Sequence, residues 1–404
     1  MKAKTKKLGM PQLEERQAVL SECRHLKMAG SAHAYVRGNT LKFYEWLEAA
    51  ASGVVPDGPP VWICGDCHVG NLGPLANAEG RIDIQIRDFD QTVIGNPAHD
   101  LIRLGLSLAT AARGSDLPGV TTAKMIEAMM EGYEQALEGE VVDQDEKPES
   151  VRIVMKRAVG RTWKNLARER LEDTSPTIPL GSTFWPPSEE EAQEIRQLFA
   201  KDLVSRLVTS LHSRDDDAEV ELLDAAYWVK GCSSLGRLRF AVLLGVGGGS
   251  GREADLCLMD VKEAVRAGAP RAPNVEMPQD DAERVVEGAR HMSPSLGDRV
   301  LPAHVLGRAV FIRELRPQDL KVEIDRLSRE EAMKVAKFLA AVVGRAHGRQ
   351  MDASTRQIWH GELSRDRQKN LDAPSWLWSS IVELVSSHEA AYLEHCRRYA
   401  MTAH

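Results

Sequence analysis

Long apolar runs are absent from this 404-residue sequence. No uncharged apolar stretch approaches the roughly 18 to 20 residues of a membrane-spanning helix, so we expect no membrane partner. The opening residues, MKAKTKKLGMPQLEERQ, are basic but contain no apolar segment typical of a secretion signal, which favours a cytoplasmic protein. Long basic runs are also absent and the formal net charge is −7, so we expect no nucleic-acid partner.

Cysteine is scarce, with six residues in the chain, yet Cys64, Cys67 and His68 form a Cys-x-x-Cys-His string. This string is typical of c-type haem attachment, which takes place outside the cytoplasm. A zinc site would require a second pair of ligands at short spacing, which the other cysteines do not provide. A thioredoxin-like pair should begin a helix, whereas Gly70 and Asn71 indicate a turn. We therefore expect no haem, and two buried thiols that pack around a loop.

The spacing of apolar residues predicts an α+β protein with a β-rich middle and helices towards both ends. Its 43% apolar content is typical of a globular chain with a sizeable core. We expect a helical part over 1–215, a β-rich lobe over 216–325, and further helices over 326–404. The predicted helices are 12–50, DLIRLGLSLATAAR, AKMIEAMMEGYEQALEG, EEEAQEIRQLFAKDLVSRLVTSL, DDAERVVEGARHM, REEAMKVAKFLAAVVGRAHGRQ and the C-terminal segment. The predicted strands are PPVWIC, RIDIQIRDFD, RLRFAVLLG, ADLCLMDVK and RAVFIREL, the third and fourth joined as a hairpin by VGGGSG.

Three polar residues follow the first two predicted strands. Asp66 comes after PPVWIC, Asn71 follows in the next turn, and Asp88 ends RIDIQIRDFD. Phosphoryl transfer requires a carboxylate that orients the attacking hydroxyl, and a carboxylate and a carbonyl oxygen that hold Mg²⁺. Asp66, Asn71 and Asp88 supply these groups in that order. Asp90 is either a second metal ligand or a turn residue, and His68 either contacts phosphate or braces the loop.

The stretch CGDCHVGNLG…IRDFDQTVIGNPAHDLIRL resembles the signature of aminoglycoside phosphotransferases and choline kinases. Those enzymes read His-Gly-Asp-x-His-x-x-Asn, then Ile-Asp-Phe/Trp-acid, then Gly-Asp-Pro-x-x-Asp-Leu. The resemblance covers about 40 residues and departs from the signature at Cys64 and Arg87. Over much of its length the chain also resembles the bacterial family named domain of unknown function 2252. The shared features are Tyr35-Val36-Arg37-Gly38, the GDxHxxN loop, DFD, KEA and RVVEG.

The kinase resemblance implies a phosphate-binding loop and an ATP lysine, which kinases place before the catalytic loop. The residues before Cys64 read as helices, so we look for these parts downstream. The segment VKGCSSLGRLRFAVLLG offers a glycine-rich turn whose backbone amides would cover the phosphates. Lys262, at the end of the strand LCLMDVKEA, occupies the position of the lysine that binds the α- and β-phosphates. The expected nucleotide-contacting residues of the turn are Gly231, Ser233, Ser234 and Gly236.

The helix DDAERVVEGARHM carries Glu283 and Glu287 on one face, and either could pair with Lys262. FIRELRPQDL would be the last strand and the hinge. These parts follow the catalytic loop, so we expect a circularly permuted protein-kinase-like fold, its β-rich N-lobe late in the chain and its helical C-lobe built from both chain ends. Lys262 should then lie close to Asp88, and the helix over 330–350 should pack against the strand before Cys64.

The resulting hypothesis is a Mg²⁺- and ATP-dependent phosphotransferase that acts on a hydroxyl of a small molecule or, less readily, of a protein. Asp66 would orient the acceptor, Asn71 and Asp88 would hold Mg²⁺, and Lys262 would bind ATP. An AMP-transferring enzyme, a catalytically silent nucleotide-binding or interaction protein, and a metallohydrolase that uses no nucleotide remain alternatives. Basic side chains around Arg37 and in 150–190 would suit an anionic acceptor.

Overall fold

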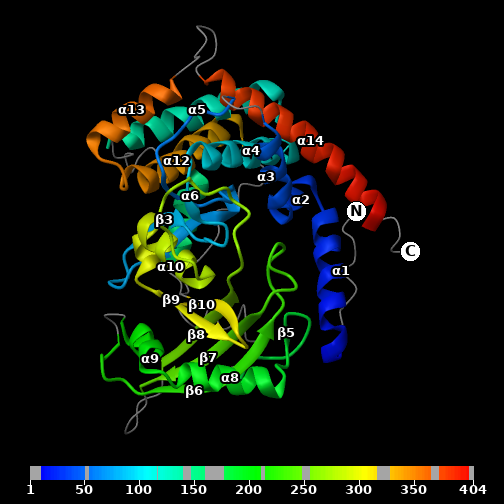
Figure 1. The fold of residues 1–404 in the computed structure, drawn as a ribbon, viewed down its shortest axis with the longest axis vertical. Coiled ribbons are helices and arrows are strands. Elements are labelled where there is room, and N and C mark those ends of the chain that lie inside the picture. The colour runs from blue at the N-terminus through cyan, green and yellow to red at the C-terminus, as the bar shows by residue number, and fades with distance from the viewer. Residues whose placement is uncertain are drawn as a thin grey trace.

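The computed structural model describes residues 11–50, 54–115, 117–139, 147–159, 177–210, 214–247, 255–315, 328–364 and 373–399. It is a mixed α+β structure with a sheet-containing half and a helical half (Figure 1). The hinge expected after the last strand, most of the hairpin tip VGGGSG and most of the basic segment in 150–190 lie outside the described residues. Among the described helices, none is both long and apolar enough to cross a bilayer.

The sheet-containing half is built on an antiparallel six-stranded sheet with the order β5-β6-β7-β8-β10-β9. Strands β7 and β8 form the predicted hairpin, with Arg239 opposite Lys262. Every residue of β7 is buried, which accounts for its continuous apolar sequence. The strands are β5 (Phe184–Trp185), β6 (Val220–Trp228), β7 (Arg239–Val246), β8 (Asp255–Glu263), β9 (Val300–Val305) and β10 (Arg308–Glu314).

The two faces of the sheet have different environments. Helices α8 (Glu189–Phe199) and α9 (Asp202–Thr209) cover the face that points away from the helical half (Figure 1). Cys257, Met259 and Val261 of β8 belong to that apolar cluster. Because side chains alternate along a strand, Asp260 and Lys262 point to the opposite face, towards the helical half.

The helical half surrounds two short antiparallel sheets, β1–β4 and β2–β3. The β2–β3 hairpin places Leu72 opposite Ile86, so the loop before β2 and the loop after β3 emerge side by side. These strands are β1 (Val61–Ile63), β2 (Leu72–Ala76), β3 (Ile82–Ile86) and β4 (Val93–Gly95). The helices are α2 (Ala32–Gly38), α3 (Thr40–Ala49), α4 (Ala98–Gly114), α5 (Gly119–Leu137), α6 (Glu149–Val159), α12 (Arg329–Gly348), α13 (Ala353–Leu363) and α14 (Ser375–Tyr399).

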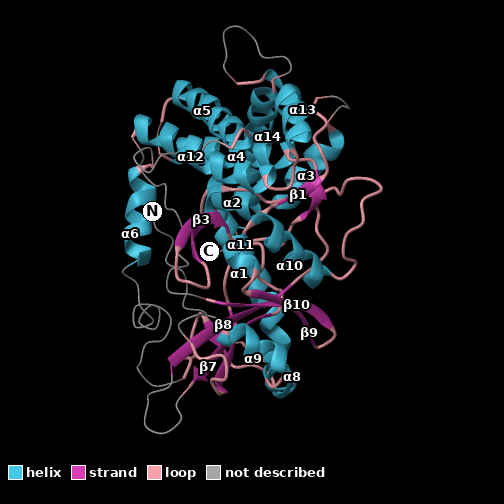
Figure 2. Cartoon of the chain, turned by 90° about the vertical axis from the view of Figure 1, so that its left-hand side faces the viewer, coloured by secondary structure: helices cyan, strands magenta, loops and turns pink. Residues whose placement is uncertain are grey.

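Two helices connect the halves. Helix α1 (Arg16–Ala29) pairs Arg16 with Glu191 of α8 at 2.6 Å, and its other end packs beside α14 through the stacked rings of His25 and Tyr399. Helix α10 (Asp281–Met292), followed by the short α11 (Pro294–Gly297), lies between the six-stranded sheet and the helical half (Figure 2). The loops that carry Asp66 and Asp88 therefore face the inner surface of the sheet.

Most strongly periodic segments form the predicted elements, with a few differences. EEEAQEIRQLFAKDLVSRLVTSL forms two helices, because Lys201 adopts an extended conformation between α8 and α9. Strands β2, β4, β5, β6 and β9, and helices α6, α11 and α13, are not among the predicted elements. The helix over 330–350 packs against β1 as expected. Gln350 donates to the carbonyl of Trp62 at 3.0 Å and accepts from its amide at 2.8 Å.

Candidate active site

The loop after β1 is anchored by Asp100 from the first turn of α4. Its carboxylate accepts hydrogen bonds from the amides of Cys64 at 2.8 Å and Gly65 at 2.9 Å. The Asp100 carboxylate also lies 3.1 Å from Nε2 of His347, and Nδ1 of His347 lies 2.9 Å from the Tyr133 hydroxyl. Asp100 and His347 are fully buried. They therefore join α4 and α12 to the loop and fix its backbone.

Gly65 makes the tight turn of this loop possible. Its φ of +74° lies in the left-handed region, and a Cβ at this position would lie 2.1 Å from the Gln91 carbonyl oxygen. The Tyr44 hydroxyl donates to the Gly65 carbonyl. Any larger residue at 65 would displace the following residue, Asp66.

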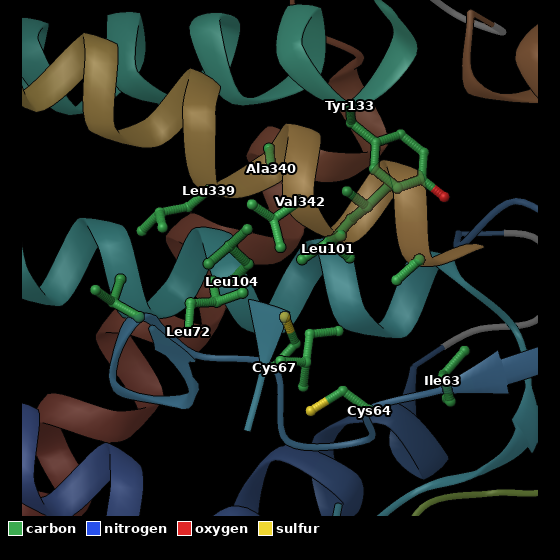
Figure 3. Close-up of a cluster of buried hydrophobic side chains, with 14 of the residues drawn as sticks. Ile63, Cys64, Cys67, Leu72, Leu101, Leu104, Tyr133, Leu339, Ala340 and Val342 are labelled. Atoms are coloured by element: carbon green, nitrogen blue, oxygen red, sulfur yellow. The ribbon is translucent and has the colours of Figure 1, made fainter. Parts of the chain in front are cut away.

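Cys64 and Cys67 are both completely buried, as expected for packing residues. Figure 3 shows them at the edge of a core formed with Leu101, Leu104 and residues of α12. Its hydrogen bond to Cys64, together with burial, raises the pKa of the Cys67 thiol. The thiols contribute to the core beneath the loop.

Asp66 lies at the surface of this core with a cation beside it. Its Oδ1 accepts from Nε of Arg103 at 2.8 Å, and its Oδ2 accepts from the Thr40 hydroxyl at 3.0 Å. Nε2 of His68 lies 4.0 Å from the same Oδ2. Burial raises the pKa of Asp66, and Arg103 limits that rise. Burial, with the charges of Arg37 and Arg103, holds the pKa of His68 well below its usual value, which favours the neutral imidazole.

Asn71 is oriented by the same loop. Its Nδ2 donates to the carbonyl of Asp66 at 2.9 Å, which leaves its side-chain carbonyl as the group for another partner. Asn71 lines a small cavity with Asp66 and Asp88. The three residues predicted from the motif therefore share one site.

Lys262 reaches this site from the sheet, as expected. Its Nζ lies 3.0 Å from Oδ1 of Asp88, which is 174 residues away in the chain, and 2.7 Å from Oδ1 of Asp90. The Asp88 side chain is 43% exposed, whereas that of Asp90 is 11% exposed. Burial opposes ionisation of Asp88, but Lys262 and Arg313 together lower its pKa. Burial and the charge of Asp88 raise the pKa of Asp90.

The glycine-rich turn between β6 and β7 closes over the acids. Gly231 and Gly236 have φ values of +92° and +94°, which explains glycine at both positions. Ser233 lines the cavity, whereas the Ser234 hydroxyl donates to the carbonyl of Lys230 within the turn at 3.1 Å. Arg237, at the end of the turn, lies 3.7 Å from Asp90.

The expected partner of Lys262 on α10 is not observed. Glu287 pairs with Arg290 at 2.6 Å, and Glu283 is exposed. The inner face of α10 instead presents Arg284, which is 3% exposed and donates to the carbonyls of Thr92 and, at 3.3 Å, Asp90. Helix α10 therefore contacts the backbone of the acidic loop, which is the loop that carries Asp88 and Asp90. The carboxylates of these two residues pair with Lys262 in place of the predicted glutamate.

Further cations line the inner face of the sheet. Nε of Arg239 donates to Oδ1 of Asp260 at 2.8 Å, and its Nη2 lies 2.5 Å from Oδ2 of the same carboxylate. Arg313 lies 3.6 Å from Asp260 and donates to the carbonyl of Arg87 at 3.0 Å. Burial opposes ionisation of Asp260, but Arg239 lowers its pKa. Lys262 thus lies within a group of charges that are already paired.

The cavity between these groups has a volume of about 20 Å³. A single water occupies roughly 10–15 Å³ on this scale, so the cavity fits one water or one small ion. Its lining comes from both halves of the molecule. The lining residues are Thr40, Asp66, Asn71, Asp88, Asp90, Gln91, Ser233 and Arg237.

Sequence reasoning missed four groups at this site: Thr40, Arg103, Arg237 and Arg284. One of them had a local signal, because Arg103 follows Asp100 by three residues, which places both on one face of α4. The other three come from α3, the turn before β7, and α10. Only the folded chain brings them to the acids.

The chain belongs to the family described as "Uncharacterized protein conserved in bacteria (DUF2252)", whose model matches residues 16–398. The match spans both halves and every residue of the site. Comparison with curated proteins gave no match. Comparison with solved structures gave none either.

Proposed function

We propose that this DUF2252 chain is a Mg²⁺- and ATP-dependent phosphotransferase that acts on a hydroxyl group, built on a circularly permuted protein-kinase-like fold. The observation that carries the proposal is the placement of Lys262 against Asp88 and Asp90, at 3.0 and 2.7 Å. A lysine and a metal-binding carboxylate that serve one triphosphate must lie close together.

The strand order supports the proposed fold. Kinases place the glycine-rich loop ahead of a lysine on the third strand, followed by a helix. Here the glycine-rich turn joins β6 to β7, Lys262 lies on β8, and α10 follows. The contact between Gln350 and Trp62 supports the permutation, because in unrotated order α12 would lead into the Asp66 loop.

The residues present fit a magnesium ion. Asp88, Asn71 and Asp90 offer hard oxygen donors around a cavity of ion size. Within the described residues no three His, Cys, Asp or Glu side chains form a ready-made metal site, so phosphate and water oxygens would complete the coordination. Bound Mg²⁺ would neutralise charge on the phosphates of the nucleotide.

Catalysis would then rest on positioning and charge. Asp66 accepts the proton of the acceptor hydroxyl while the hydroxyl oxygen forms a bond to the γ-phosphorus. The bond between the γ-phosphorus and the β–γ bridging oxygen breaks, and ADP leaves. Lys262 contacts the phosphates, and Arg103 holds the Asp66 carboxylate in place. The raised pKa of Asp66 brings it closer to that of a useful base.

A triphosphate does not fit a cavity of about 20 Å³, so nucleotide binding requires the turn that carries Ser233 and Arg237 to move away from the acids. Such an opening would break the contact between Arg237 and Asp90, which lie 3.7 Å apart. Opening would also let Lys262 exchange a carboxylate for a phosphate. On this proposal the arrangement with Lys262 on the carboxylates is the closed form of the enzyme.

The test is calorimetric titration of the full chain with ATP, with and without Mg²⁺. We expect Mg²⁺-dependent binding by the wild-type protein that is weakened at least tenfold in Lys262→Met. Lys334→Met is the matched control, because Lys334 lies on the exposed side of α12 and pairs with Glu330. Absence of ATP binding by the wild-type chain would refute the proposal.

Product analysis separates phosphoryl from AMP transfer on the same site. ADP with a phosphorylated acceptor supports the proposal, and pyrophosphate with an adenylylated acceptor supports the alternative. ATP binding without either product would identify a silent nucleotide-binding protein.

A further inference from the structure

Three buried side-chain nitrogens around Asp66 have no hydrogen-bond partner among the described residues. They are Nε of Arg37 and Nη1 of Arg103, which are donors, and Nδ1 of His68, which is a donor or an acceptor according to the tautomer. His68 is 4% exposed and Arg103 is fully buried. An unsatisfied buried donor is costly, so a ligand that supplies acceptors here would gain affinity.

Arg37 lies directly on the catalytic loop. A Cβ on Gly70 would lie 3.0 Å from Cζ and 3.1 Å from Nη2 of Arg37, and 3.1 Å from Cε1 of His68. The guanidinium and the imidazole thus share the space that glycine leaves open. Arg37 makes no ion pair or hydrogen bond with any residue that the structure describes.

The charges on this side of Asp66 do not balance. Arg37 and Arg103 contribute two positive charges and Asp66 one negative charge, and the neutral form of His68 adds none. The neighbouring acids, Asp88 and Asp90, already have Lys262 and Arg237 as counter-charges. The excess positive charge therefore lies beside the base and is available to a ligand.

Building on the proposed function, we propose that Arg37 and His68 form an oxyanion subsite beside Asp66, and that the acceptor is a hydroxyl compound that carries a carboxylate or phosphate group. Arg37 would bind the anionic group and present the hydroxyl to Asp66. A guanidinium suits both oxyanions because its N–H groups match their geometry. The cationic acceptors of the enzymes that the motif resembles would be repelled here.

The experiment uses four small probes that each carry a hydroxyl: glycerate, glycerol 3-phosphate, glycerol and choline. Each is titrated into the full-length wild-type chain by calorimetry without nucleotide, and then tested for Mg·ATP-dependent phosphorylation. We expect at least one of the two anions to bind and to be phosphorylated, and glycerol and choline to do neither. Comparison of glycerate with glycerol 3-phosphate shows which oxyanion the subsite prefers.

The variants are Arg37→Gln, Arg37→Lys and the control Arg81→Gln, which removes a positive charge from an exposed turn. We expect Arg37→Gln to weaken anion binding at least tenfold, Arg37→Lys to retain part of it, and Arg81→Gln to leave it unchanged. ATP affinity should be equal in all of them. If Arg37→Gln does not fold, the comparison of anion binding between Arg37→Lys and the wild-type chain tests the subsite.

The subsite is refuted if neither anion binds, if glycerol or choline binds as well as the anions, or if Arg37→Gln weakens ATP binding instead. These outcomes are separate from failure of the proposed function. Anion binding without any ATP binding would sustain the subsite and refute the phosphotransferase, and the converse would refute only the subsite.

Discussion

Replacement of Lys262 by methionine should destabilise the protein at neutral pH, because Asp88 and Asp90 would face one another without their shared counter-charge. Removal of one partner from a fully buried pair costs about 3–5 kcal/mol. The Asp88 side chain is 43% exposed, so water screens part of the repulsion. We expect a loss of roughly 1–3 kcal/mol in the free energy of unfolding.

The loss should depend on pH with a definite sign. Without Lys262 the pKa values of both carboxyls in the folded state rise, so protonation favours the folded variant. A carboxyl group with a raised folded-state pKa destabilises the fold once pH exceeds that pKa, and the penalty disappears at lower pH. The difference between wild type and Lys262→Met should therefore be larger at pH 7 than at pH 4.

Urea denaturation at both pH values measures these differences, with Lys334→Met as the exposed control. A second substitution, Asp90→Asn, should restore part of the stability of Lys262→Met, because it removes one of the two repelling charges. If Lys262→Met is as stable as wild type at pH 7, or if Asp90→Asn makes it less stable, the assigned charge pairing is wrong.

Three further outcomes test the site. Asp66→Asn should reduce phosphoryl transfer by at least 100-fold and leave ATP affinity within twofold, because Asp66 faces the acceptor; calorimetry and product assays separate the two. Asp88→Ala should abolish Mg²⁺-dependent turnover, while Asn71→Ala should reduce it less. Activity measured over a range of Mg²⁺ concentrations tests both, and equal activity of Asp88→Ala and wild type would contradict the metal assignment. The double variant Cys64→Ser/Cys67→Ser should bind ATP like wild type, and a haem spectrum or bound zinc in the wild-type protein that is lost in the variant would refute the packing role.

The strands that the sequence did not reveal have identifiable physical causes. Strand β9 lies at the edge of the sheet and contains Pro302, which an edge position tolerates but which argues against a strand in sequence reading. Strand β2 contains Gly73 and Pro74, and so resembles a turn, yet every residue in it is buried and paired with β3. In both cases pairing with a neighbouring strand outweighed local preference.

The predicted part of the site was the part that a short motif encodes. Asp66, Asn71 and Asp88 were found together because two adjacent loops carry them, and the structure brings all three to one cavity. The approach of Lys262 followed from the kinase resemblance rather than from any local pattern. Arg103 could have been suspected from its spacing to Asp100, whereas Thr40 belongs to a distant helix and had no signal.

The glutamate prediction shows a limit of helix periodicity. Spacing placed Glu283 and Glu287 on one face of α10 but could not say which face points inward. Arg284 occupies the inward position, because its N–H groups satisfy the backbone carbonyls of the acidic loop. Because Arg284 binds the backbone carbonyls of this loop, the side-chain carboxylates of Asp88 and Asp90 remain free to pair with Lys262.

The arrangement of charges explains how three aspartates can lie around one small cavity. Asp66 is paired with Arg103, Asp88 and Asp90 share Lys262, and Arg237 lies 3.7 Å from Asp90, so three cations compensate the three acids within the chain. A bare metal ion would have to displace the ammonium of Lys262, which disfavours its binding. A metal ion that binds together with a nucleotide brings phosphate groups. Lys262 can then pair with these phosphates instead of with the carboxylates. The site should therefore bind Mg²⁺ and nucleotide together much more tightly than either alone.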